Sequence, residues 1–276
     1  MSHYTELWSK GGGSDPELNI YLYPNTKNDL AATKDGGTVA EAIRNGADQI
    51  YYNTNVGSYT ISRFKADYFW YNYSELSWSS TQGGIWMDNH FGGYLNDKND
   101  EGPTNGTGRN LRGENPGIHH LVHSLPSSDD KGWNKGCYGF QSSSSSADMD
   151  DGAGAYLKNS AWGETGDLSW SPVCGYDDLT RNAAIQEMTH LCLDFRSDPS
   201  ERYSNGDDHA HGTISTDTGC SPYYNCKPVS PMSTYHWDES PQPNCDPEHT
   251  TADSHDQSMT SCVFDRIDDT LSLKGL

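Results

Sequence analysis

The chain has 276 residues, a formal net charge of −21 and a mean hydropathy of −0.85. Such acidity excludes the basic surface that binds nucleic acid or an anionic membrane, so we expect neither partner. Low hydropathy is typical of disordered chains, but 8 Trp and 17 Tyr are not, and we predict a folded protein with a small aliphatic core. High acidity also suits solubility in strong salt, which favours a halophilic source over a merely acidic secreted protein.

Seven cysteines indicate an exported protein. None forms a Cys-x-x-Cys pair, so a thiolate zinc site or a redox motif is not expected. The candidate disulfide pairs are Cys220 with Cys226, Cys245 with Cys262, and Cys137 with Cys174. Cys192 lies in an apolar helical pattern and is expected to be a buried thiol. Disulfides form in an oxidising compartment, so we expect an extracellular protein, and no apolar run reaches the length of a membrane span.

The beginning of the chain predicts a strand followed by a helix. Residues 1–16 include a Gly-Gly-Gly-Ser stretch and are expected to be a flexible segment ahead of a single domain over residues 17–276. Residues 18–23 alternate as a strand does, and residues 38–50 carry apolar side chains at helical spacing. This order indicates an α/β layer architecture, to which the β-branched and aromatic residues 59–73 add one or two strands.

Polar stretches in the middle of the chain predict long surface loops over residues 88–115 and 142–151. The acidic side chains of the second loop are Asp148, Asp150 and Asp151. They make calcium a candidate cofactor, but their spacing does not fit an EF-hand loop, so solvated charge is the preferred interpretation. Residues 153–161 predict a short strand that leads into a loop over residues 162–175.

Three histidines lie within residues 117–124, Gly-Ile-His-His-Leu-Val-His-Ser. A strand here places His119 and His123 on one face and His120 on the other. Imidazole is a common metal ligand, so His119 and His123 are candidate ligands. The alternative is a strand whose histidines are exposed or satisfied by hydrogen bonds.

Residues 181–195 predict a helix, because apolar side chains recur at steps of three and four. Gln186 and His190 are one helical turn apart, and Glu187 lies beside them. Two ligands one turn apart can touch one metal, and a carboxylate next to them can accept a proton. The alternative is an ordinary amphipathic helix whose polar side faces water.

Further candidate residues follow this helix. His209 and His211 occur in Asp-His-Ala-His-Gly, and Met232 and Tyr235 occur in Ser-Pro-Met-Ser-Thr-Tyr. Over residues 181–235, the order of active helix, further His and Met resembles the metzincins. The resemblance is closest to uncharacterised secreted haloarchaeal proteins of zincin-like type that carry Gln-Glu-x-x-His.

The resemblance implies an α+β zincin-like fold. We therefore expect a mixed twisted sheet with an N-terminal helix, an active-site helix and a C-terminal helix, joined by many long loops. A helical pattern over residues 256–273 provides the last of these helices. The sheet part would span residues 17–175, and the part with the active helix and the Met-turn would span residues 176–276.

The same resemblance assigns roles to particular residues. Glu187 takes the position of the general base, His190 and His209 take ligand positions for zinc, and Met232 with Tyr235 takes the Met-turn.

This chain departs from the family in two ways. Gln186 stands where the first His ligand is expected, and His209 lies farther beyond His190 than the family places its third ligand. The remaining ligand is therefore His211, a histidine of the 117–124 strand, or Gln186.

The expected function is a secreted, monomeric, zinc-dependent peptidase that acts on polypeptides. The alternative is a secreted binding or structural module with a zincin fold and an altered metal site. A third hypothesis is carbohydrate binding through aromatic side chains, for which core or hairpin packing is the preferred interpretation. These side chains are Trp70, Trp78 and Trp86. The chain has no Gly-x-Ser-x-Gly elbow and no glycine-rich phosphate loop, so serine-hydrolase and nucleotide-binding functions are not expected.

Overall fold

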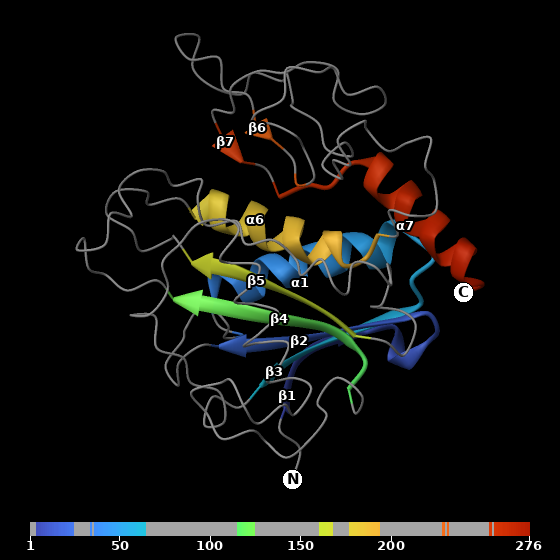
Figure 1. Cartoon of the computed structure of the whole chain (residues 1–276), viewed down its shortest axis with the longest axis horizontal. Coiled ribbons are helices and arrows are strands. Elements are labelled where there is room, and N and C mark those ends of the chain that lie inside the picture. The colour runs from blue at the N-terminus through green and yellow to red at the C-terminus, as the bar shows by residue number, and fades with distance from the viewer. Residues whose placement is uncertain are drawn as a thin grey trace, which may run out of the picture.

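The computed structural model describes residues 4–24, 34, 36–64, 115–124, 160–167, 177–193, 228–229, 231, 254–255 and 257–276. These residues form a mixed α+β arrangement in which helices cover one face of a sheet (Figure 1).

The central element is a five-stranded sheet in the order β1-β3-β2-β4-β5. The strands are β1 (Tyr4–Lys10), β2 (Glu17–Pro24), β3 (Ser58–Phe64), β4 (Gly117–Ser124) and β5 (Ser160–Asp167). Strands β2 to β5 run parallel to one another, and β1 pairs antiparallel with β3 at one edge. A separate short parallel pair joins β6 (Pro228–Val229) to β7 (Ser254–His255).

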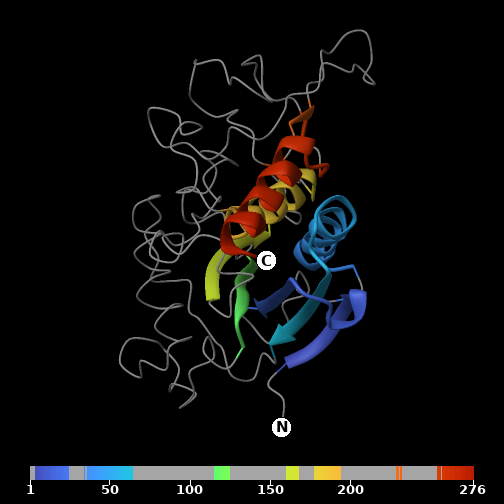
Figure 2. The ribbon, with the colours of Figure 1, turned by 90° about the vertical axis from the view of Figure 1, so that its right-hand side faces the viewer.

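The described helices lie on the same side of this sheet. They are α1 (Thr38–Asn53), α6 (Asp177–His190) and α7 (Ser261–Lys274). Figure 2 shows α1 and α6 side by side above the strands, with α7 next to α6. The expected combination of a mixed sheet with an N-terminal, a middle and a C-terminal helix is confirmed.

The core fills the space between the sheet and the helices. Strand β2 contributes alternate residues to it, Leu18, Ile20 and Leu22, all fully buried. This alternation places one face of β2 under the helices. The helices add apolar stripes at steps of three and four, which share one hydrophobic cluster with the strand residues.

Gly46 allows α1 and α6 to approach closely. A Cβ atom at this position would lie 2.6 Å from Met188 Cε and 3.3 Å from Ile185 Cγ2. Any larger side chain on α1 would therefore push against α6. The position of α6 relative to the sheet thus depends on a residue without a side chain in the neighbouring helix.

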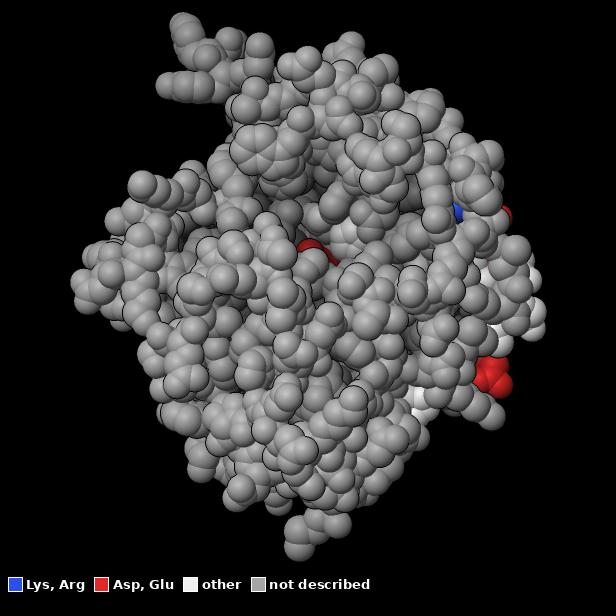
Figure 3. Space-filling view, viewed as in Figure 1, with Lys and Arg blue, Asp and Glu red and all other residues white. Residues whose placement is uncertain are grey.

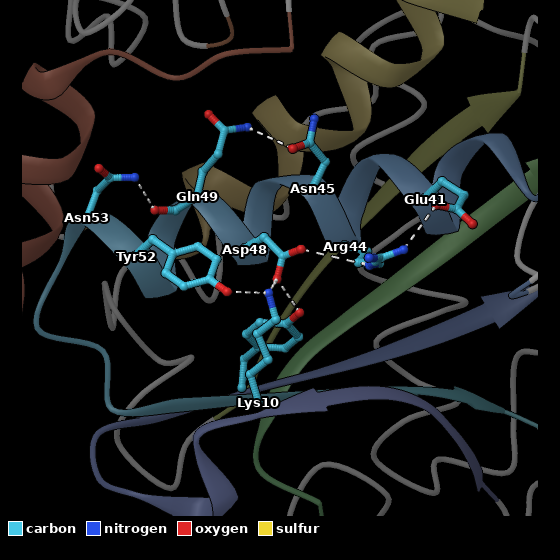
Figure 4. Close-up of polar contacts among 9 residues, drawn as sticks. Lys10, Glu41, Arg44, Asn45, Asp48, Gln49, Tyr52 and Asn53 are labelled. Atoms are coloured by element: carbon cyan, nitrogen blue, oxygen red, sulfur yellow. Dashed lines mark hydrogen bonds and ion pairs between the residues drawn. The ribbon is translucent and has the colours of Figure 1, made fainter.

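The N-terminal segment differs from the expected flexible lead. Residues 4–10 form the edge strand β1, and Gly11–Gly13 form a tight 3₁₀ turn. Figure 4 shows how Lys10 is anchored: its Nζ lies 2.5 Å from Asp48 Oδ1 and 3.0 Å from Tyr52 Oη. Tyr59 also donates to Asp48 at 2.5 Å. This network joins β1, α1 and β3, which a search for local sequence patterns could not reveal.

The same network shifts two pKa values. Burial, followed by the hydrogen bond to Asp48, raises the pKa of the Tyr59 hydroxyl well above its usual value. The hydrogen bond to Asp48 is also the main cause that raises the pKa of Lys10. Both donors therefore stay protonated at neutral pH, and the contact between β1 and α1 is maintained.

Several predicted boundaries were wrong. Helix α7 begins at Ser261, later than the 256–273 pattern indicates. The strand expected at residues 153–161 and the loop expected at 162–175 meet inside β5, which runs over Ser160–Asp167 and pairs with β4 along its whole length. Helix α6 begins at Asp177 and ends at His190, earlier at both ends than the 181–195 pattern indicates. The glycines of β5 resemble a loop, but parallel pairing with β4 keeps this backbone extended.

Candidate functional site

A polar stripe runs along α6 at helical spacing. Its members, at steps of four, are Asn182, Gln186 and His190. All three are buried, with Gln186 2% and His190 5% exposed, and the adjacent Glu187 is 3% exposed. The side of the helix that looked solvent-facing in the sequence is thus enclosed. Burial of four polar side chains on one helix is costly unless each has a partner or a ligand.

Gln186 contributes a buried side-chain oxygen to this stripe. Its Oε1 atom is fully enclosed and has no hydrogen-bond partner among the described residues. A buried carbonyl oxygen left without a donor costs about 1–3 kcal/mol. A buried polar atom without a partner calls for a physical explanation, and a bound ion is one such explanation.

Glu187 and His190 follow Gln186 in the sequence, one and four residues later. Both residues are nearly fully buried. Figure 3, drawn from the same side as Figure 1, shows acidic atoms at the level of α6. A nearly buried carboxylate within one turn of an imidazole can exchange protons in an environment with little water.

The apolar side of α6 holds the helix against its neighbours. Ile185 and Met188 face Gly46 of α1. Thr189 donates to the carbonyl of Ile185 at 2.7 Å and lies 3.4 Å from Met259 Sδ, in the segment before α7. Helix α6, which carries the polar stripe, therefore packs against both α1 and the segment before α7.

His119 has a hydrogen-bond partner at each ring nitrogen. Nε2 lies 2.9 Å from the Asn115 carbonyl and Nδ1 lies 2.8 Å from Tyr23 Oη. A carbonyl can only accept, so Nε2 carries the proton and Nδ1 accepts from the Tyr23 hydroxyl. The Tyr23 oxygen then accepts from Tyr4 Oη at 2.6 Å. This geometry matches the alternative of a strand histidine satisfied by hydrogen bonds.

His120 lies on the opposite face of β4, as the alternation predicts. It pairs in register with Leu22, so both side chains lie on the face that the helices cover. Burial lowers the pKa of His120 to about 3, and the ring is neutral in the folded protein. Both described histidines of this strand are thus part of the packed sheet. The side chain of His123 lies outside the described residues.

Most other candidate residues also lie outside the part of the chain that the structure describes. The histidine, Met-turn and cysteine candidates among them are His209, His211, Met232, Tyr235, Cys137, Cys174, Cys220, Cys226 and Cys245. The calcium and carbohydrate candidates Asp148, Asp150, Asp151, Trp70, Trp78 and Trp86 lie there too.

Two cysteines can be compared with their predicted states. Cys262 is disulfide-bonded, as expected, although its partner lies outside the described residues. Cys192 is a buried thiol, also as expected, and lies 3.4 Å from the Met188 carbonyl. The buried thiol lies just beyond the end of α6, where its small apolar side chain fills the core.

Within the described ranges, no three His, Cys, Asp or Glu side chains gather closely enough to share a metal ion. The carboxamide of Gln186 is not among these four residue types, and the histidines at 209 and 211 lie outside the described ranges. Residues that the sequence did not single out are Gln49, Thr189 and Met259, which fix the end of α6. Their contacts join distant parts of the chain, so no local motif marks them.

No protein-family model matches the sequence, and no curated protein matches it either. No helix in the described part of the chain has both the length and the apolar character of a membrane span.

Proposed function

We propose that the protein is a secreted, zincin-like, metal-dependent peptidase whose site lies on the polar stripe of α6. The observation that carries this proposal is the buried Gln186 Oε1, which lies one residue before Glu187 and one turn before His190 and has no hydrogen-bond partner in the part of the chain that the structure describes. A metal ion would satisfy this oxygen and use the adjacent imidazole.

The donor set fits a divalent metal. A carboxamide oxygen and an imidazole nitrogen four residues apart on a helix can reach the same ion. A neutral oxygen is a weaker ligand for zinc than an imidazole, so further ligands must strengthen the site. His209 and His211 follow α6 in the chain and are the candidates for that role. His119 is less suited, because both of its ring nitrogens hold structural hydrogen bonds.

The fold supports the same proposal. Helix α6 is the next described element after the parallel strand β5 and lies beside α1 on one face of the sheet. This is the arrangement of sheet, N-terminal helix and active-site helix that the resemblance to zincins implies.

In this proposal Glu187 is the general base. Its carboxylate accepts a proton from the attacking water and later returns it to the leaving amine. The enclosed position of Glu187 excludes bulk water and keeps the proton near the reacting groups. When bound, zinc would polarise the scissile carbonyl and lower the pKa of the water.

The proposal is tested with Glu187→Gln in the full chain. This change preserves the size of the side chain and removes the base, so metal content should stay constant while peptide cleavage falls about 10² to 10⁴-fold. The matched control is Glu41→Gln on α1. Glu41 lies 3.6 Å from Arg44 in a partly exposed ion pair, so this change should leave metal content and peptide cleavage unchanged. Equal cleavage by the Glu187 variant and the wild type would refute the role of Glu187.

The second candidate is a zincin-like binding module without peptidase activity. Gln186 at the first ligand position favours it, because a weaker ligand suits a site that binds without catalysing. Metal binding without cleavage of any peptide in a broad library at high salt would select this candidate.

A further inference from the structure

The end of α6 is held by a segment from the far end of the chain. Residues 257–260 lead into α7, and Met259 within them is 7% exposed and belongs to the same core as α6. Its Sδ lies 3.4 Å from Thr189 Oγ1. The Thr189 proton goes to the Ile185 carbonyl at 2.7 Å, so the contact with sulfur is a packing contact.

Gln49 of α1 fixes this segment through two backbone hydrogen bonds. Its Nε2 donates to the Gln257 carbonyl at 2.8 Å, and its Oε1 accepts from the Met259 N–H at 2.8 Å. One carboxamide thereby sets both the position and the direction of the chain at residue 258. Figure 4 shows Gln49 on the side of α1 away from Lys10 and Asp48.

The two hydrogen bonds from the Gln49 side chain to Gln257 and Met259 are called the clamp below. Two further constraints act on the residues directly after it. Thr260 caps α7, since its Oγ1 lies 3.4 Å from the Val263 N–H, and Cys262 is disulfide-bonded. Met259 is therefore held on both sides and cannot move away from α6 without breaking one of these contacts.

The last turn of a helix is where local opening begins, because its final carbonyls lack helical donors. In α6 this turn carries Glu187, Thr189 and His190. Beyond it the backbone tightens, with Leu191 N–H donating to the Met188 carbonyl at 3.2 Å. A packing contact at Thr189 therefore stabilises the turn that bears the proposed site.

We infer that Gln49 is a positioning residue for this site: it holds Met259 against Thr189 and thereby fixes the turn of α6 that carries Glu187 and His190. The inference rests on the proposed function only where it says that this turn of α6 carries a metal site. The clamp itself can be tested in the metal-free protein.

The first test is Gln49→Met in the full chain, which keeps the length of the side chain and removes both hydrogen bonds. Hydrogen exchange measured by mass spectrometry on metal-free protein should accelerate about tenfold in peptides over residues 186–193 and 257–260. The control Asn53→Ala removes a 2.8 Å bond to the Gln49 carbonyl within α1 and should leave these peptides unchanged.

A second pair of variants covers the case in which Gln49→Met does not fold. Met259→Ala removes the side chain that contacts Thr189 and should give the same local acceleration. Met259→Leu keeps most of the bulk and should restore slow exchange at the end of α6. Acceleration spread evenly over the sheet and all helices, or none at residues 186–193, would overturn the inference.

The third measurement uses cobalt(II) as a probe of the site. Gln49→Met should weaken cobalt binding about tenfold and change its visible absorption band, whereas Asn53→Ala should do neither. If the wild type binds no cobalt or zinc while the exchange result holds, the clamp stands and the proposed function falls. If the wild type binds cobalt and Gln49→Met leaves both the affinity and the band unchanged, the positioning role falls.

Discussion

Replacement of Gln186 by Met tests whether this residue serves binding or stability. Met has a similar length and no polar group, so the change removes the buried Oε1, for which the described ranges supply no hydrogen-bond partner. Removal of such an oxygen should stabilise the metal-free protein by about 2 kcal/mol. For a domain of this size that corresponds to a rise in melting temperature of about 4–8 °C.

Metal should reverse the order of the two proteins. At a zinc concentration 100 times the dissociation constant, the wild type gains about 2.7 kcal/mol of stability from binding. Gln186→Met lacks one ligand and should gain far less, so the wild type should become the more stable of the two proteins in zinc. A protein that becomes more stable when an active-site group is removed shows the usual conflict between stability and function.

The assay is thermal unfolding followed by circular dichroism, in chelator and in excess zinc. The control Gln257→Met changes a partly exposed glutamine whose Oε1 lies 3.4 Å from Asn45 Nδ2, and should shift the melting temperature little under either condition. A lower melting temperature of Gln186→Met in chelator would refute the reasoning, because it would mean that the carboxamide stabilises the fold.

Three further predictions concern the fold. Gly46→Val should destabilise the protein by about 1–3 kcal/mol in urea unfolding, because its side chain would collide with Met188; an unchanged midpoint would contradict the close approach of α1 and α6. His120 has a pKa of about 3 in the folded protein and 6.5 in the unfolded chain. Its neutral ring therefore contributes fully to the free energy of unfolding above pH 6.5, and this contribution falls by about 1.4 kcal/mol per pH unit as the pH drops toward 3. His120→Leu should remove that pH dependence. If the curves of unfolding free energy against pH for the wild type and the variant were parallel, the prediction would be wrong. The net charge of −21 predicts a melting temperature that rises from dilute buffer to molar salt, and equal values would reject a halophilic adaptation.

Local patterns were sufficient to predict the elements that form the centre of the fold. Alternation at residues 18–23 and 117–124 gave β2 and β4, and helical spacing gave α1, α6 and α7. These patterns record which side of each element is buried, and that side is fixed over short distances in the chain.

Elements stabilised by distant partners were either missed or misplaced. Strand β1 is held by Lys10 at Asp48 and by pairing with β3, and the glycine-containing β5 is held by its register with β4. Neither partner is visible in the local sequence. Edge strands and glycine-rich strands depend most on such pairing, because their own side chains bury little apolar surface.

The candidate site was predicted in part for the same reason. The spacing of Gln186, Glu187 and His190 is a local property, but their burial depends on packing around α6. The hydrogen bonds of His119 depend on the register between β2 and β4. The contacts of Gln49 with Met259 join residues from opposite ends of the chain.

The most direct test of the central claim is the metal content of the full chain after dialysis against zinc and then against metal-free buffer at high salt. The account predicts about one zinc per chain in the wild type and in Glu187→Gln, and almost none in His190→Ala. A wild-type protein that retains no zinc, or a His190→Ala variant that retains all of it, would contradict a metal site on α6.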